Sequence, residues 1–144
     1  MTKSRYILIT LYFYGPFKLT KGDNYLFDSD FVKDEGIYLW TIKDEVRGIN
    51  YIHYIGQTDS LGKRHREHVM HIAGLDYYII DPVAAKKGIH KVIWNGMWRD
   101  KSTDAVANLI DSYKEISHKV TDYLGLINVF FAPTDLEKHI RRHV

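Results

Sequence analysis

Two short apolar and aromatic runs separated by a polar stretch form the clearest pattern in the chain. Residues 36–42 have the sequence GIYLWTI and residues 51–55 have the sequence YIHYI. Both runs are rich in the β-branched and aromatic side chains that favour strands. Residues 43–50 between them are mostly polar and contain a glycine and an asparagine. The pattern predicts an antiparallel β-hairpin.

Side chains alternate between the two faces of a strand, which groups the hairpin residues. Tyr38, Trp40 and Ile42 share one face of the first strand, and Ile52 and Tyr54 share a face of the second. Whether Tyr38 and Tyr54 lie on the same face of the sheet depends on the strand register. The sequence alone does not determine that register.

A helix is predicted directly after the hairpin. Gly56 ends the second strand, and Thr58, Asp59 or Ser60 can cap a helix that runs through about His71. Four positions of this helix are spaced to lie near one stripe, and the middle two are one turn apart and therefore neighbours: Leu61, Arg64, His68 and Ile72.

Two longer apolar runs predict strands at the ends of the chain. Residues 6–14 are nearly all apolar or aromatic, which predicts a strand covered on both sides and ended by Gly15 and Pro16. Residues 124–131 predict the last strand.

An insertion of about fifty residues, roughly 73–122, separates the Arg64 helix from that last strand. Residues 81–87 predict a short capped helix ended by Gly88, and residues 104–121 predict a longer one. The longer helix has an apolar stripe: Val106, Leu109, Ile110, Tyr113, Ile116 and Val120. We therefore expect a helical insertion.

Composition indicates one domain over residues 1–144, because 45% hydrophobic residues suffice for a core. The absence of cysteine excludes a disulfide scaffold and thiolate metal sites, and it fits a reducing cytoplasm. Neither a signal peptide nor a run of about 18 apolar residues is present, so we expect a soluble, cytoplasmic protein without a membrane partner.

The net charge of +2 is small, so any nucleic-acid surface must come from local clustering of basic residues. One candidate cluster combines two tryptophans, which can stack on bases, with nearby cations: Lys91, Trp94, Trp98, Arg99 and Lys101. The alternative is that both indoles pack the insertion onto the domain.

The hairpin and helix together resemble the GIY-YIG nuclease superfamily. The first strand begins Gly36-Ile37-Tyr38, the second ends Tyr54-Ile55-Gly56, and Arg64 and His68 follow at the family's spacing. The resemblance covers about residues 35–72. It implies a mixed α+β fold with a small, mainly antiparallel sheet flanked by helices. It also implies a metal-dependent endonuclease that hydrolyses DNA phosphodiester bonds.

The resemblance implies roles for the motif residues. Tyr38 or Tyr54 would take a proton from the attacking water. A phenol with a pKa of about 10 is a poor base at neutral pH, so it needs a neighbour such as His68 to accept its proton. Arg64 would hold the scissile phosphate through its planar fork. Four further residues would position the site or contact nucleic acid: Gln57, Thr58, Lys63 and Arg66.

The resemblance also implies one Mg²⁺ or Mn²⁺ per site, bound by a glutamate about three turns into a helix after the last strand. The matching helix here would cover residues 136–144, capped by Thr134 or Asp135, and the chain stops where that glutamate is expected. Glu137 lies in the first turn, where it favours the helix N-terminus. Glu115 has a separation from Arg64 closer to some family members, in a different sequence context.

Three explanations follow. The chain is a fragment whose parent supplies the glutamate beyond Val144, which we favour because the helix ends mid-turn. Alternatively, Glu137 or Glu115 binds the metal. Finally, the protein is a catalytically silent nucleic-acid-binding module derived from this fold. A structural or protein-interaction domain that keeps the hairpin for folding alone is a further rival. DNA is the expected partner, and cutting both strands with one site per chain favours a homodimer or two successive nicks.

A zinc site is a competing interpretation of three nearby histidines, His65, His68 and His71. At about 100° per residue, the outer two lie about 240° apart around a helix. That spacing argues against a shared tetrahedral zinc ion.

Overall fold

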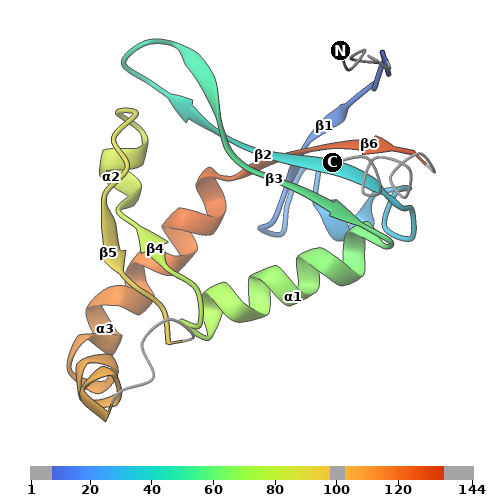
Figure 1. The fold of residues 1–144 in the computed structure, drawn as a ribbon. Helices are drawn as coiled ribbons and strands as arrows, with labels where there is room; N and C mark the ends of the chain where they lie inside the picture. The colour runs from blue at the N-terminus through green and yellow to red at the C-terminus, as the bar shows by residue number, and fades with distance from the viewer. Residues whose placement is uncertain (1–7, 98–102, 135–144) are drawn as a thin grey trace, which may run out of the picture.

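The computed structural model describes residues 8–97 and 103–134. From β3 onward strands and helices alternate along the chain, and one short 3-10 helix, η1, lies near the N-terminus (Figure 1). The elements are β1 (Tyr14–Lys18), η1 (Leu26–Asp28), β2 (Gly36–Asp44), β3 (Ile49–Thr58), α1 (Leu61–Ala73), β4 (Ile79–Ile80), α2 (Pro82–Ala85), β5 (Val92–Trp94), α3 (Thr103–Leu126) and β6 (Asn128–Pro133).

The main sheet has four strands in the order β1-β6-β2-β3, and all its neighbours are antiparallel. Helices α1 and α3 lie on the same side of this sheet (Figure 1). The predicted mixed α+β fold with a small antiparallel sheet is confirmed. The predicted hairpin and the helix after it are also present, as β2, β3 and α1.

The register of the hairpin places Tyr38 and Tyr54 on one face of the sheet. Tyr38 pairs with Gly56, and Trp40 pairs with Tyr54. Directly opposite residues of an antiparallel pair point to the same face. The next pair joins Thr41 to Ile52, so His53 is an extra residue at a β-bulge.

The turn between β2 and β3 is closed by a buried carboxylate. Asp44 Oδ1 accepts hydrogen bonds from the backbone N–H groups of Val46 and Arg47, at 2.9 and 3.1 Å. Gly48 has φ of 69°, in the left-handed region where glycine has no Cβ penalty. The glycine in the polar stretch therefore has a defined place in the turn.

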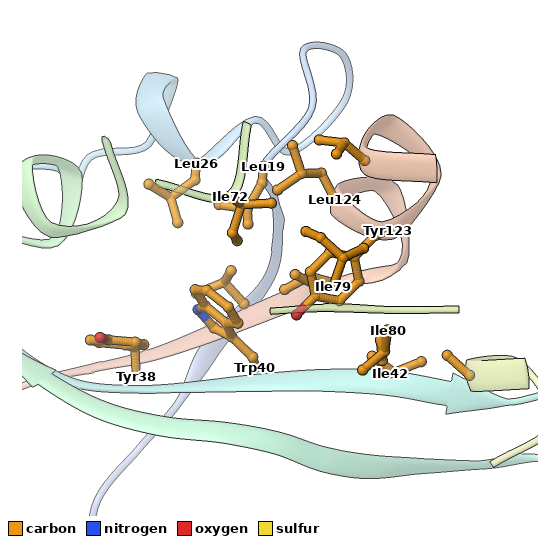
Figure 2. Packing of buried hydrophobic residues seen from close by; sticks show 14 of the residues in the cluster. Leu19, Leu26, Tyr38, Trp40, Ile42, Ile72, Ile79, Ile80, Tyr123 and Leu124 are labelled. Carbon is orange, nitrogen blue, oxygen red and sulfur yellow. The ribbon is translucent and has the colours of Figure 1, made fainter. Parts of the chain in front are cut away.

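The core lies between the sheet and the helices. Figure 2 shows Tyr38, Trp40 and Ile42 pointing from β2 toward Ile72 of α1 and Tyr123 of α3. All five are buried, which confirms that the three β2 residues share a face. Because Tyr38 belongs to this core, packing holds its side chain in a fixed position.

Helix α1 buries one face against that core. Three of the four residues in its predicted stripe are buried, Leu61, His68 and Ile72, whereas Arg64 is partly exposed. Ser60 occupies the N-cap position, but its hydroxyl bonds to the Val32 carbonyl oxygen at 3.2 Å instead of capping the helix.

The insertion contains both predicted helices and also a two-stranded sheet, β4-β5, so the expectation of a helical insertion was incomplete. These strands have two and three residues, too short to give a period along the sequence. Helix α3 continues through Leu126, and β6 begins at Asn128. The predicted strand 124–131 was therefore wrong at its start. Leu124 is a buried residue of α3, and the apolar run continues from the helix into the strand without a break.

The apolar stripe predicted on α3 is only partly buried. Ile116 and Val120 are buried, whereas Val106, Ile110 and Tyr113 are exposed. Among the described residues, no helix is long and apolar enough to cross a membrane.

The prediction for residues 6–14 was wrong. Residues 8–13 have no regular structure, Leu8 is 95% exposed, and the strand β1 starts only at Tyr14. Gly15 and Pro16 lie inside β1, which an edge strand tolerates because one side needs no ladder hydrogen bond. The aromatic residues near β1 pack on one another instead, as the Tyr14 and Phe31 rings do at 5.0 Å.

Candidate active site

A buried hydrogen bond joins the GIY strand to α1. Tyr38 Oη lies 2.8 Å from His68 Nε2, and the two side chains are only 1% and 4% exposed. Tyr38 is fixed by its place in the central strand β2, and His68 by its place on the buried face of α1. The structure thus brings together two predicted site residues that are far apart in sequence.

Gly56 leaves the space that this tyrosine occupies. It pairs with Tyr38 across the hairpin, and a Cβ at position 56 would overlap Cζ and Oη of the phenol. Any larger residue would push the Tyr38 ring away from His68. Steric contact with Tyr38 therefore explains why the YIG strand has a glycine at position 56.

Arg64 lies one helical turn before His68, at the edge of the buried face. Its Nη1 is 3.1 Å from Glu67 Oε2, and both side chains are partly exposed. Burial raises the pKa of the Tyr38 phenol above its usual value. The nearby guanidinium of Arg64 opposes this rise, because its positive charge favours the phenolate, but burial is the larger effect.

Tyr54 lies beside Tyr38 at the mouth of the site. The two ring centroids are 6.0 Å apart, and Tyr54 is 39% exposed. The two tyrosines therefore differ in environment: one is buried and bonded to an imidazole, and the other faces solvent.

A groove of about 530 Å³ runs over these residues. It follows the end of β3, the connection to α1 and the first turns of α1. Besides the two tyrosines, its polar lining includes Gln57, Thr58, Asp59, Ser60, Lys63, Arg64 and Glu67.

Three of the four predicted nucleic-acid contacts line this groove: Gln57, Thr58 and Lys63. Thr58 is buried, and its hydroxyl donates to the Ser60 carbonyl oxygen at 2.8 Å, so it shapes the turn into α1. Arg66 is exposed and is not part of the groove lining.

Sequence reasoning missed the two carboxylates of the groove, Asp59 and Glu67. The spacing of Glu67, three residues after Arg64, is a signal that could have found it, because such pairs are neighbours on a helix.

Comparisons of the chain with protein-family models, with curated proteins and with solved structures gave no match. The resemblance to GIY-YIG nucleases therefore depends on the motif residues and on the geometry described above.

The candidate metal ligands are less well placed than the tyrosine, histidine and arginine. Glu115 lies on α3, is 75% exposed, and has an oxygen 4.0 Å from Lys119 Nζ; it does not line the groove. Glu137 lies outside the described residues. Within residues 8–97 and 103–134, no group of three or more His, Cys, Asp or Glu side chains is arranged to hold a metal ion.

The three histidines of α1 have different partners. His65 Nε2 accepts from Trp40 Nε1 at 2.9 Å, which leaves His65 Nδ1 to donate to the Leu61 carbonyl oxygen at 2.9 Å. His71 Nδ1 is 3.0 Å from Asp76 Oδ2, whereas His68 faces Tyr38. His65 is thus a core residue that orients Trp40.

Of the predicted tryptophan cluster, only part lies in the described chain. Trp94 is half-buried and donates from Nε1 to the Leu75 carbonyl oxygen at 2.8 Å. It also packs against the hydrophobic core, which supports the packing alternative for this indole. Trp98, Arg99 and Lys101 lie outside the described residues.

Burial keeps the imidazoles beside the tyrosine neutral. Burial, together with smaller effects of the neighbouring His65 and Arg64, lowers the pKa of His68 to about 3. Burial likewise lowers the pKa of His65 to about 4. His68 Nδ1 is buried and has no hydrogen-bond partner among the described residues.

These shifts predict that the protein loses stability as the solution becomes acidic. Below the unfolded-state pKa of about 6.5, the unfolded chain binds protons that folded His65 and His68 do not. The free energy of unfolding should therefore fall from pH 7 toward pH 4, by about 2 kcal/mol per histidine at pH 5.

Denaturant unfolding at a series of pH values measures this slope. The variant His65→Gln should make the slope smaller by the share of one histidine, whereas His118→Gln, at an exposed histidine on α3, should leave it unchanged. A free energy of unfolding that stays constant between pH 7 and pH 5 would contradict the prediction.

Proposed function

We propose that the protein is a metal-dependent endonuclease that hydrolyses DNA phosphodiester bonds in the manner of GIY-YIG nucleases. The observation that supports this most is the 2.8 Å hydrogen bond between Tyr38 and His68, with Arg64 beside it and a polar groove above it. A buried tyrosine needs a hydrogen-bond partner for its hydroxyl, but that partner need not be an imidazole with a guanidinium beside it. Together the three groups form an acid–base pair next to an anion site.

Arg64 is the residue that binds the scissile phosphate. Its fork matches two phosphate oxygens, and it stabilises the charge that grows on them in the transition state. Lys63 also lines the groove and adds a second positive charge. Glu67 pairs with Arg64 in the free protein. When phosphate binds, this ion pair must break, or the guanidinium must contact both groups.

The proton of the attacking water passes to Tyr38 Oη, while the phenol proton passes to His68 Nε2. In the free protein the low pKa of His68 opposes this transfer. Burial is the main cause of that low pKa, and the positive charge of Arg64 is a smaller one. A bound phosphate near Arg64 offsets this smaller effect and so makes His68 a better proton acceptor than it is in the free protein.

A divalent metal, when bound, would neutralise charge on the phosphate and assist the leaving oxygen. Mg²⁺ keeps several waters and is held by one or two carboxylates together with phosphate oxygens, so one glutamate near the groove is sufficient. Glu137 suits this role better than Glu115, which is exposed on α3 and outside the groove lining.

Chain length supports Glu137. Pro133 and Thr58 both pair with Gly36, one from each side, so they lie about 10 Å apart at two strand spacings. Glu137 follows Pro133 by four residues, and four residues can span at most about 13 Å. The length of chain between Pro133 and Glu137 therefore allows the proposed role of Glu137.

Plasmid nicking tests the proposal. The protein should nick supercoiled DNA in Mg²⁺ or Mn²⁺ and stop when EDTA is added. Glu137→Gln should lower the rate by at least about a hundredfold, as loss of a charge-stabilising group does. The matched variant Glu115→Gln should cut like the wild type.

The other outcomes decide between the remaining explanations. Cutting only by a chain extended beyond Val144 would place the ligand there. Salt-sensitive DNA binding without cutting, even by the extended chain, would favour a silent nucleic-acid-binding module. One candidate site per chain also leads us to propose a homodimer or two successive nicks for a double-strand break.

A further inference from the structure

A second cavity of about 320 Å³ adjoins the groove. Tyr54 and Arg64 line both cavities and so mark the boundary between them. The insertion supplies four further lining residues, Asp76, Tyr77, Tyr78 and Asn95. The insertion therefore builds a pocket directly beside the proposed phosphate site.

The walls of this cavity are mainly aromatic rings. Trp40 and Tyr54 have centroids 5.2 Å apart on one side, and Tyr77 lies 6.0 Å from His68. Trp40 and Tyr123 point into the same space between the sheet and α3 (Figure 2). Aromatic walls of this kind suit a planar ring, which can pack edge-to-face or offset against them.

The β-bulge of β3 contributes two neighbouring residues to the cavity. His53, the extra residue, and Tyr54 both line it, although successive strand residues normally face opposite ways. His53 Nε2 is held 2.8 Å from the Tyr123 hydroxyl. Burial lowers the pKa of His53 to about 4, so this imidazole is neutral near pH 7.

A few polar groups complete the lining. Asp76 has an oxygen 3.0 Å from His71, and the Asn95 amide is exposed at the rim. An amide offers both a donor and an acceptor to the edge of a ring, as Asn does to adenine. Aromatic walls with a few polar groups are typical of a small-ligand site.

We propose that this pocket binds one nucleobase, that of the nucleotide attached to the phosphate held by Arg64. The inference rests on the proposed function and extends it to the substrate. At about 320 Å³ the pocket is near the lower limit for ligand sites, which suits one unpaired base. Its occupant is thus a nucleotide that is single-stranded or displaced from the stack.

Binding of mononucleotides without metal tests the pocket separately from cutting. The four deoxynucleoside 5′-monophosphates are titrated by calorimetry, with deoxyribose 5-phosphate as the base-free control. At least one nucleotide should bind about 5- to 150-fold more tightly than the control, since base stacking contributes about 1–3 kcal/mol.

Variants show whether that preference comes from the pocket. Tyr78→Ala and Asn95→Ala should each reduce it and leave deoxyribose phosphate binding unchanged. Tyr113→Ala, at an exposed tyrosine of α3 outside the pocket lining, should have no effect.

The two proposals can fail independently. Equal binding of nucleotides and control, no binding at millimolar concentration, or a preference that survives both pocket variants would overturn the nucleobase pocket. Metal-dependent nicking together with any of these results would leave the nuclease proposal standing. A pocket-dependent base preference without nicking, even by the extended chain, would support the pocket and overturn the nuclease.

Discussion

Replacing Arg64 with alanine should lower the rate of plasmid nicking by at least about a hundredfold, with the fold intact. Removing a single group that stabilises transition-state charge typically costs a factor of 10²–10³. Folding should be nearly unaffected, because the ion pair with Glu67 is partly exposed at both ends. Exposed pairs of this kind contribute at most about 1 kcal/mol.

Two further variants separate the geometry of Arg64 from its charge. Arg64→Lys keeps the positive charge but loses the two-pronged contact, so its nicking rate should also fall well below the wild type. Arg66→Ala removes the same side chain two residues later, at an exposed position outside the groove lining, and should cut normally.

Nicking rates are compared at equal protein concentration, with circular dichroism melting curves as the check on folding. Wild-type cutting by a folded Arg64→Ala protein would defeat the site assignment. Equal losses in Arg64→Ala and Arg66→Ala would indicate a general effect of positive charge on DNA binding.

The hairpin and α1 could be predicted because their information is local. Strand composition, the glycine of the turn and the one-turn spacing of Arg64 and His68 all lie within one stretch of chain. The sequence did not determine the pairing of Trp40 with Tyr54, because the bulge at His53 shifts the register. One extra residue in a strand leaves no periodic signal that distinguishes it from its neighbours.

Predictions were wrong where an apolar run does not correspond to a single strand. The run 124–131 spans the last turn of α3, the buried Ile127 and most of β6, and nothing in its composition marks the change. Residues 8–13 resemble a buried strand but have no regular structure. Hydrophobicity alone did not show how much of the surrounding sheet was available to cover them.

The second cavity could not be predicted from the sequence. Its lining comes from β2, β3, α1, the insertion and α3, so it exists only after long-range packing. Tyr78, Asn95 and Tyr123 carry no local motif that would group them. By contrast, the Tyr38–His68 pair follows from a motif whose residues also form one part of the core.

Tyr38→Phe should reduce nicking far more than Tyr54→Phe does, which would resolve the choice between the two motif tyrosines. Tyr38 Oη is the atom bonded to His68 and acted on by Arg64, so it can pass a proton onward. General acid–base groups typically contribute a factor of 10²–10⁴, and we expect a loss of that size. Tyr54 sits half-exposed at the rim, and its hydroxyl should matter by less than about tenfold.

Phenylalanine keeps the ring of Tyr38 in the core and removes only the hydroxyl. His68 then loses its partner at Nε2 while Nδ1 also has none among the described residues, so stability should fall by about 1–3 kcal/mol. Nicking must therefore be measured well below the melting temperature of the variant. Tyr51→Phe is the matched control, because it also removes one hydrogen-bonded hydroxyl from the hairpin, the one that donates to the Ala85 carbonyl oxygen, away from the groove. If Tyr38→Phe cuts as well as Tyr51→Phe, the proton acceptor is not Tyr38. If Tyr54→Phe shows the larger loss, the role passes to Tyr54.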